Sequence, residues 1–598
     1  MDGLIINTYI FILSTWLLLF LIFTGFGLFI RRSFGLITID AESLLLSFWM
    51  GWAFTIFFLQ IWNLFFKVSY VSIILVSILG LAGIFWNYRS LWYFLKKSFS
   101  KNWVFYLILF FVAYWLAHRA ILPLSNSDSV YHLSSVVWAR SFPVVPGLGN
   151  LYDRLAYNSS FFLYAAMLDV GPWFQKSHHF ANGILMLMLF AQILLSCWRL
   201  YRGSNNLRLY HIFTIFFLAP ALTYSWIFNV SSSSPDLSII VLGIILAVQL
   251  LAFLENSKRN YKESSYNIFF IVTIAMVGIT VKLSFSVLGV VSVLIVFIVW
   301  LFKKSGQHIY NKKKLLIWVI IIASISLIPW MIRGVILSGY IAYPVPIGLF
   351  PVEWRLPYED VVNMANVIKA WARAPGPGYM RALNNWTWLK PWAIRTFSSF
   401  SVAMPLVITF FSCFTALFYR LSRKHKKDRR NIIWLFLLPP ALSLIYWFIA
   451  APDPRFAGSS FWILGAGAVI IAISSFIKYR KAAKLIIILF FSISLLCNWK
   501  YVPVDGEKDF VKVIVEEKNI SRAFEQLHFS KGNFQDFPNL KPEKFATRSG
   551  LVLYIPQGEW YEAWYTPLPS TTTPDLNLRL RQEGDMRYGF IIESTNKR

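Results

Sequence analysis

The most regular feature of the chain is a series of long apolar blocks separated by short polar stretches. Each block runs for roughly 18–25 residues, which is long enough to cross a hydrocarbon core of about 30 Å as a helix. We therefore predict an all-α polytopic membrane protein with about 14 transmembrane helices. The predicted spans are residues 5–30, 41–66, 68–86, 103–123, 178–199, 210–228, 237–254, 267–282, 284–302, 315–337, 396–418, 432–451, 462–477 and 485–499.

The polar stretches between the blocks alternate in character. Basic residues gather in every second connection, as expected for cytoplasmic loops under the positive-inside rule. This places both termini, and the two large loops at 124–177 and 338–395, on the extracytoplasmic side. Three regions are predicted: N-terminal transmembrane hairpins at 1–100, a transmembrane core at 101–500, and a small extracytoplasmic α/β domain at 501–598. That last region is predicted from short alternating segments such as GLVLYIP and LNLRLR.

Composition supports a membrane protein and argues against a nucleic-acid-binding protein. The chain is 57% hydrophobic and 14% charged, with a net charge of +28. In a soluble protein such a charge would indicate nucleic acid as a partner. Here most of the basic residues lie between apolar blocks, so the charge reports topology and no nucleic-acid partner is expected. The three cysteines have neither disulfide nor zinc spacing.

The first large loop holds the strongest candidate for chemistry. Asp128, Tyr131 and His132 are spaced at i, i+3 and i+4, so a helix over 129–140 would cluster them at its first turn. Together with Asp153 they form a candidate acid/base site at a membrane edge. The alternative is that Asp128 only caps the helix, since the string Ser-Asn-Ser-Asp-Ser is rich in capping residues.

Basic residues near the predicted outer ends of spans form a second group. Cations at such positions are usually paired or functional, and they suit the phosphate of a lipid-linked substrate. The candidates are His118, Arg119, Arg154, Lys282, Arg333, Arg373 and Arg455. The alternative is snorkelling, or ion pairing with Asp128, Asp236 or Asp453. Asp236 itself follows Pro235 after a serine run, which is typical of a helix start.

These features resemble the GT-C superfamily of polytopic glycosyltransferases, which use polyprenyl-phosphate-linked sugars. The resemblance rests on the large early loop, its acid and the basic span ends, and it implies a GT-C-like core with Asp128 as the catalytic base. Asp128 lacks the adjacent second acid common there, and three spans precede the key loop's own span. Strings such as NSDSVYHL, VKLS, WMIRGVILSGY and APDPRF are also similar to an uncharacterised family of bacterial multi-pass membrane proteins, which implies the bacterial inner membrane.

The resemblance leads to a functional hypothesis. We expect an inverting glycosyltransferase that moves a sugar from a polyprenyl-phosphate donor to a glycan, lipid or protein acceptor outside the cytoplasm. A flippase or transporter of lipid-linked glycan, and a glycan polymerase or ligase, are the alternatives. No cofactor or metal site is predicted with certainty, and a divalent cation such as Mg²⁺ or Mn²⁺ stays open.

Overall fold

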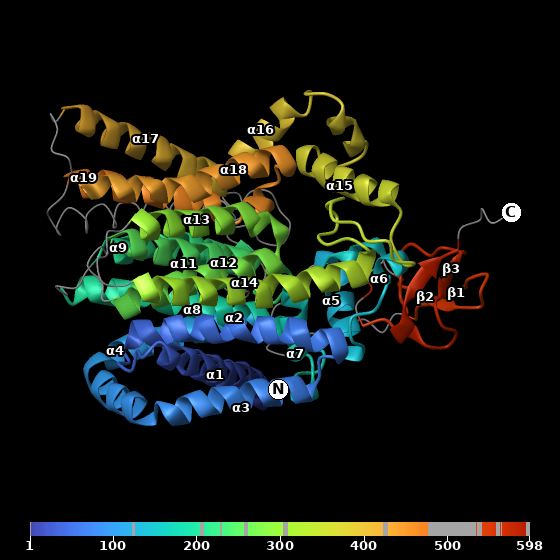
Figure 1. Ribbon diagram of the computed structural model, residues 1–598, viewed down its shortest axis with the longest axis horizontal. Helices are drawn as coiled ribbons and strands as arrows, with labels where there is room; N and C mark the ends of the chain where they lie inside the picture. Colours follow the sequence, from blue (N-terminus) through green and yellow to red (C-terminus); the bar gives the residue numbers. More distant parts are fainter. Residues whose placement is uncertain are drawn as a thin grey trace.

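The computed structural model is a bundle of long helices that run alongside one another (Figure 1). It describes residues 2–121, 126–203, 208–227, 230–255, 261–302, 309–422, 429–476, 534, 541–557, 563 and 565–593. The helices are α1 (Asp2–Ser33), α2 (Ala41–Phe65), α3 (Tyr70–Trp86), α4 (Tyr88–Ile121), α5 (Asn126–Ser141), α6 (Leu148–Leu151), α7 (Phe161–Met167), α8 (Ser177–Tyr201), α9 (Leu209–Ile215), α10 (Leu218–Ile227), α11 (Pro235–Glu255), α12 (Tyr261–Val281), α13 (Ser286–Phe302), α14 (Ile309–Ser338), α15 (Tyr358–Arg373), α16 (Leu389–Phe397), α17 (Phe400–Ser422), α18 (Leu438–Ala450) and α19 (Ser460–Phe476).

Short 3₁₀ turns and four strands complete the described chain. The 3₁₀ turns are η1 (Asp153–Ala156), η2 (Gly171–Trp173), η3 (Leu283–Phe285), η4 (Tyr379–Leu383), η5 (Arg429–Leu437), η6 (Pro454–Ala457) and η7 (Met586–Tyr588). Strand β1 (Glu543–Ala546) pairs antiparallel with β2 (Val552–Ile555), and β3 (Leu578–Leu580) pairs antiparallel with β4 (Phe590–Ile592). The predicted C-terminal unit is thus built from two small two-stranded sheets where it is described. Residues 501–533 of that prediction lie outside the described residues.

The structure confirms a helical protein with many candidate membrane spans, but it describes fewer spans than the 14 predicted. Within the described ranges nine helices are long and apolar enough to cross a membrane, or 11 if each of two bent helix pairs is one span. The predicted span at 210–228 is broken into α9 and α10, and the basic stretch after residue 87 is helical, as the first part of α4. The predicted span at 485–499 lies outside the described residues.

Close contact between backbones holds the N-terminal helices together. A Cβ added to Gly51 on α2 would lie 1.8 Å from the backbone oxygen of Phe23 on α1. A Cβ on Gly83 of α3 would lie 1.9 Å from the oxygen of Gly25 on α1. Glycine is therefore required where α2 and α3 cross α1, because any side chain would separate the helices.

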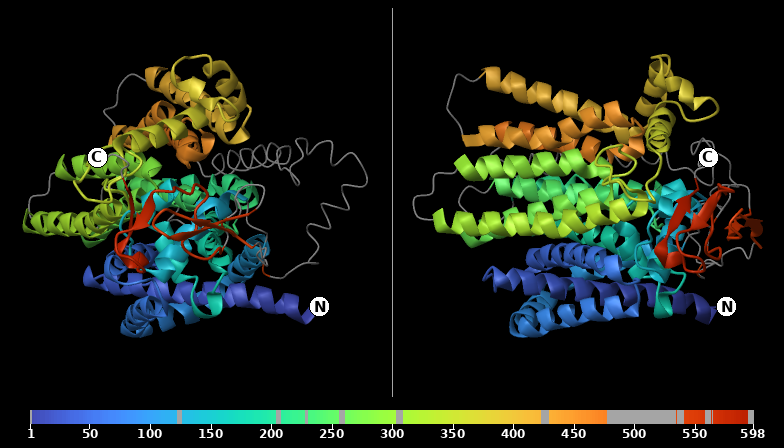
Figure 2. Two further views of the ribbon diagram at one scale, coloured as in Figure 1. Left: turned by 90° about the vertical axis from the view of Figure 1, so that its right-hand side faces the viewer. Right: turned by 45° about the vertical axis from the view of Figure 1, so that its right-hand side comes forward.

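The two ends of the bundle differ in what they carry. The helices alternate in direction, so the segments after α4 and α14 and the C-terminal strands all lie at one end, on the right in Figure 1. Figure 2 shows the strands next to the first of these loops, and the arm formed by α15 and α16 at the same end. The described basic residues that flank α3–α4, α8–α9 and α11–α12 lie at the other end. We call these the loop end and the basic end.

The helix expected over 129–140 in the first large loop is present as α5. The chain after it is mostly irregular up to residues 161–167, which form α7. The side chains of α7 are all buried in the main core, where the helix packs against α2, α5 and α8. The loop therefore folds into the end of the bundle instead of lying on its surface.

Candidate functional site

A cavity of about 430 Å³ opens at the loop end of the bundle. This volume falls in the range of small-ligand pockets. Its walls come from the segment before α7, from the α12–η3 turn, from α14, α15 and α18, and from the Tyr343–Pro346 turn. The aromatic lining residues are Tyr131, Tyr157, Phe162, Trp330, Tyr343, Tyr446, Trp447 and Phe456. Rings of this kind can stack on sugar faces or hold an isoprenoid chain.

The predicted acid/base residues lie on α5 beside this cavity. Tyr131 lines it, and its ring centroid is 5.4 Å from that of Tyr157 and 4.2 Å from that of His132. The His132 ring lies 5.5 Å from that of Phe162, which also lines the cavity. Asp128 is in the first turn of α5, where the structure describes its backbone but not its side chain. The spacing argument therefore places all three residues on the first two turns of one helix.

Two of the predicted cations are paired with acids. Lys282 lines the cavity and forms an ion pair with Asp236 in the first turn of α11. Its ammonium nitrogen also lies 4.6 Å from the centroid of the Phe456 ring. Arg455 pairs with Asp453 within the same turn, at 3.1 Å. Pairing with Asp236 and Asp453, the alternative to phosphate binding, is therefore present in the structure.

Arg333 differs from these cations. It lies near the end of α14 and is 7% exposed, yet among the described residues it has no ion-pair partner. Its Nη1 donates a hydrogen bond of 3.0 Å to Asn158 Oδ1, while its buried Nε has no partner in the described part of the chain. A small cavity of about 30 Å³, roughly the space of one water, lies against it. A buried guanidinium without an acid partner is costly to the fold.

Asn158 connects this guanidinium to the large cavity. It lines the cavity together with Trp330. Its Nδ2 donates to the Trp330 backbone oxygen at 2.5 Å, and the Trp330 indole donates back to the Asn158 backbone oxygen at 2.7 Å. The amide is thus fixed on α14, and its Oδ1 accepts a hydrogen bond from Arg333, which lines the small cavity and not the large one. Neither Asn158 nor Trp330 was among the predicted site residues, because an amide and an indole carry no charge pattern.

Asp153 and Arg154 lie on η1, next to Tyr157 and Tyr343. Burial raises the pKa of the Asp153 carboxyl above its usual range, against the opposing charge of Arg154, and Asp360 on α15 adds to the rise. Its Oδ1 is buried and has no hydrogen-bond partner among the described residues. The carboxyl is therefore suited to hold a proton close to the cavity wall.

Among the predicted residues whose side chains the structure describes, only Tyr131 and Lys282 line the large cavity. The others are not lining residues; these are His118, Arg119, His132, Asp153, Arg154, Arg333, Arg373 and Arg455. His118 and Arg119 end α4, where His118 Nδ1 shares a hydrogen bond of 2.9 Å with the Tyr9 hydroxyl and Arg119 Nε donates to the Ser225 oxygen at 3.4 Å. Arg373 ends α15, donates to the Ala382 oxygen at 3.0 Å and lies over the Trp388 ring. Both of these Arg373 contacts lie within the arm formed by α15 and α16.

A buried cluster that sequence reasoning missed ties the C-terminal segment to the first loop. Asp169 has a fully buried side chain and pairs with Arg140, at the end of α5, at 2.6 Å. The hydroxyl of Tyr565 donates to the other carboxylate oxygen at 3.1 Å. Burial raises the pKa of Asp169 to about 6, although Arg140 and Tyr565 oppose the shift. Asp169 and Tyr565 are 396 residues apart in the sequence, so no local pattern predicts their contact.

This shift predicts a pH dependence for the folded state. Because the pKa in the fold, about 6, exceeds the ordinary value of 3.8, the folded state binds the proton more tightly than the unfolded chain. The free energy of unfolding should thus fall as pH rises from about 4 to about 6, by of order 2 kcal/mol. Asp169→Asn should remove most of this slope. Urea unfolding at several pH values, with proteolytic cleavage of the C-terminal segment as the readout, measures the free energy of unfolding of both proteins. An equal pH dependence in wild type and variant would contradict the assignment.

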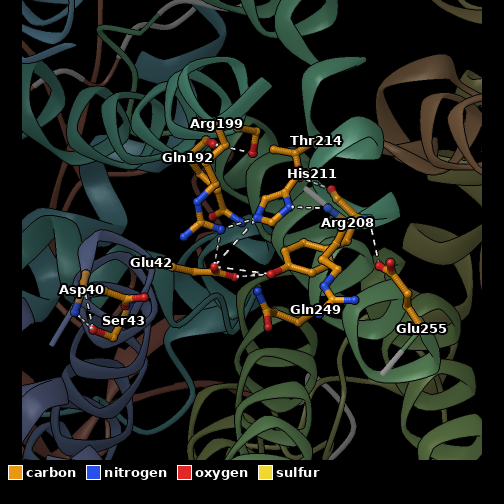
Figure 3. A network of polar contacts seen from close by, with 12 residues as sticks. Asp40, Glu42, Ser43, Gln192, Arg199, Arg208, His211, Thr214, Gln249 and Glu255 are labelled. Atoms are coloured by element: carbon orange, nitrogen blue, oxygen red, sulfur yellow. Dashed lines mark hydrogen bonds and ion pairs between the residues drawn. The ribbon is translucent and has the colours of Figure 1, made fainter. Parts of the chain in front are cut away.

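A second polar network lies at the basic end and joins α2 to α8, α9 and α11 (Figure 3). Glu42 accepts from Arg199 Nη1 at 2.7 Å and from the Tyr210 hydroxyl at 3.0 Å, and His211 contacts Arg199. Glu255 accepts from the backbone N–H groups of Leu209 and Tyr210, which start α9. Each acid here has partners that belong to the fold, so we assign the network to holding these helices together.

Comparison with known proteins gives one match. Residues 9–462 fit the family described as Domain of unknown function (DUF8201), which covers most of the chain and all the cavity residues. The chain belongs to this family. No curated protein and no solved structure matches the chain. Within the described residues, no three His, Cys, Asp or Glu side chains are grouped so as to hold a metal ion.

Proposed function

We propose that this DUF8201 chain is a membrane glycosyltransferase that uses a polyprenyl-phosphate-linked sugar. The observation that carries the proposal is Arg333, a buried guanidinium without an acid partner in the described chain, hydrogen-bonded to Asn158, which lines the aromatic cavity. Two other partly buried arginines of the bundle, Arg140 and Arg199, have carboxylate partners. An anionic ligand would supply Arg333 with the partner that the fold omits.

The proposed reaction assigns a role to each group. An acceptor hydroxyl attacks the anomeric carbon as Asp128 takes its proton, with Tyr131 and His132 beside it. The new bond joins the acceptor oxygen to that carbon, and the bond from the carbon to the phosphate oxygen breaks. Arg333 and Lys282 stabilise the charge that develops on the departing lipid phosphate. One displacement from the opposite face inverts the anomeric centre.

The proposal also includes the cellular setting. We place the chain in the bacterial cytoplasmic membrane with the loop end and both termini outside, which puts the basic end in the cytoplasm. The full count of 14 spans belongs to the same proposal. The C-terminal strands, which pack on the first loop through Asn150 and Leu151, would then face the acceptor.

A transfer assay tests the function. Wild-type protein and Asp128→Asn are reconstituted in vesicles with a polyprenyl-phosphate-sugar pool from bacterial membranes, and products are followed by mass spectrometry. We expect loss of the lipid-linked sugar and a glycosylated product with wild type, and less of both with the variant. If the lipid-linked sugar stays intact and moves to the other leaflet, the protein is a flippase and not a glycosyltransferase. Adding EDTA, then Mg²⁺ or Mn²⁺, decides whether a divalent cation takes part.

A further inference from the structure

The arm at the loop end, residues 358–397, lies across the direction of the spans. It consists of α15, η4 and α16. The axis of α16 is bent by 84° from that of the span that follows it. Figure 1 shows the arm at the loop end, above α18 and beyond the ends of the neighbouring helices. A helix at this angle is placed to lie in the membrane surface and not to cross it.

The charge of the arm departs from the pattern of the rest of the chain. From Lys369 to Arg395 it has five basic residues and no acid. Other basic residues flank α3–α4, α8–α9 and α11–α12 at the basic end, as topology requires. A basic cluster at the loop end is not explained by topology, because the positive-inside pattern disfavours it there. Topology therefore leaves this charge available to an anionic partner.

Two of the five cations are used to build the arm itself. Arg373 donates to the Ala382 oxygen at 3.0 Å, and Arg395 donates to the Ala372 oxygen at 3.2 Å. Lys369, Arg381 and Lys390 have neither an ion pair nor a side-chain hydrogen bond within the described ranges. The fold thus holds the backbone of the arm in place and leaves these three charges for another molecule.

Apolar side chains lie among these charges in two sets. Trp388 and Trp392 are buried against Trp447 and Phe461, which fixes the arm to α18 and α19. The second set is exposed and has no such cover, with Trp386 at 68% and Ile394 at 62%. Exposed indole and aliphatic groups next to basic side chains are the composition of surfaces that insert at the headgroup level of a bilayer.

We infer that the arm binds the anionic headgroups of the leaflet at the loop end through Lys369, Arg381 and Lys390. The exposed Trp386 and Ile394 enter the interface beside them. The same helix lines the cavity through Ala365 and Ile368, respectively one turn and one residue before Lys369, so headgroup binding holds one wall of that cavity in place. This inference is independent of the proposed sugar transfer, since it concerns a surface that the reaction does not use.

The test measures contact between the arm and lipid in the full chain. Cys197, Cys413 and Cys497 are replaced by serine, and Asn384→Cys, an exposed position of the arm, receives a fluorophore. The protein is placed in discs of phosphatidylcholine, or of phosphatidylcholine with about 30% phosphatidylglycerol, each with a trace of headgroup-nitroxide lipid. We expect stronger quenching in the anionic discs, reduced at high salt.

Charge variants decide what produces the quenching. Each cation near an anionic surface favours binding by about fivefold, so Lys369→Gln, Arg381→Gln and Lys390→Gln together should weaken docking by about a hundredfold. The matched control, Lys96→Gln, Lys97→Gln and Lys101→Gln, removes three exposed charges at the basic end and should change nothing. Equal quenching in both discs, or in wild type and the arm variant, would overturn the inference. Loss of quenching in the anionic discs after a soluble polyanion such as dextran sulfate is added would also overturn it, because the arm would then prefer the polyanion to anionic lipid.

Discussion

Replacing Arg333 by methionine is expected to lower the rate of sugar transfer by about 10²–10³-fold, the usual cost of removing one group that stabilises a developing oxyanion. The reason is that Arg333 is a buried cation whose charge no acid of the described chain balances. The lipid phosphate would be its partner in the transition state. Turnover of wild type and variant in the vesicle assay, at saturating and limiting donor, separates a loss in kcat from a loss in KM.

The same variant should not lose stability. A buried charge without a partner costs several kcal/mol, so methionine of similar volume should leave the Tm unchanged or raise it. Asn158 loses one hydrogen bond, which offsets only about 1 kcal/mol of that gain. Thermal unfolding in detergent gives the comparison. A drop in Tm together with the loss of activity would show that Arg333 serves the fold and not a ligand.

Arg140 provides a matched control for this experiment. It is also a largely buried arginine at the loop end, but its carboxylate partner Asp169 lies at 2.6 Å. Arg140→Met leaves that buried acid without its cation and should destabilise the protein by about 3–5 kcal/mol. Arg333→Lys should regain part of the activity, because it restores the charge without the planar fork. The opposite effects of the two methionine variants on Tm distinguish a ligand-binding arginine from a structural one.

Replacing Lys282 by methionine is expected to destabilise the fold by about 3–5 kcal/mol. Its partner Asp236 lies in the first turn of α11 with 17% of its side chain exposed, and the variant leaves that carboxylate unpaired. Asp236→Asn in the same chain should recover most of the loss, since neither charge then remains. Stability of the two single variants and the double variant gives the coupling between the residues.

Arg455→Met is the control for the Lys282 variants. The Arg455–Asp453 pair has a half-exposed arginine, so its loss should cost only about 0.2–1 kcal/mol. For activity, the double variant Lys282→Met with Asp236→Asn should remain impaired although it is folded, because Lys282 also lines the cavity. Full activity in the folded double variant would contradict a role for Lys282 at the donor phosphate.

Local patterns were enough to predict the helical elements and several site residues. The apolar blocks predicted the spans that the structure describes, because a span must satisfy its backbone internally whatever surrounds it. The i, i+3, i+4 spacing predicted that Tyr131 and His132 share the start of α5. The proline and acid at 235–236 predicted the start of α11. Each of these features depends on residues within a few turns of one another.

Features that depend on distant contacts could not be predicted. The apolar sequence of α7 fits an interface helix as well as a core helix, and only its packing against α2, α5 and α8 decides between them. Asn158 became part of the site through Arg333, 175 residues away. Burial of one loop inside the bundle cannot be deduced from that loop alone.

The contacts of the C-terminal strands set an order for the biosynthesis of the protein. Thr571 donates to the Leu151 oxygen at 2.7 Å, and Asn150 donates to the Phe590 oxygen at 3.1 Å. The strands follow the loop that they complete by 420–440 residues in the sequence, so they are translated after it and after the helices between them. The first loop therefore reaches its final contacts only when these strands have been made. A chain cut before residue 571 would lack both contacts.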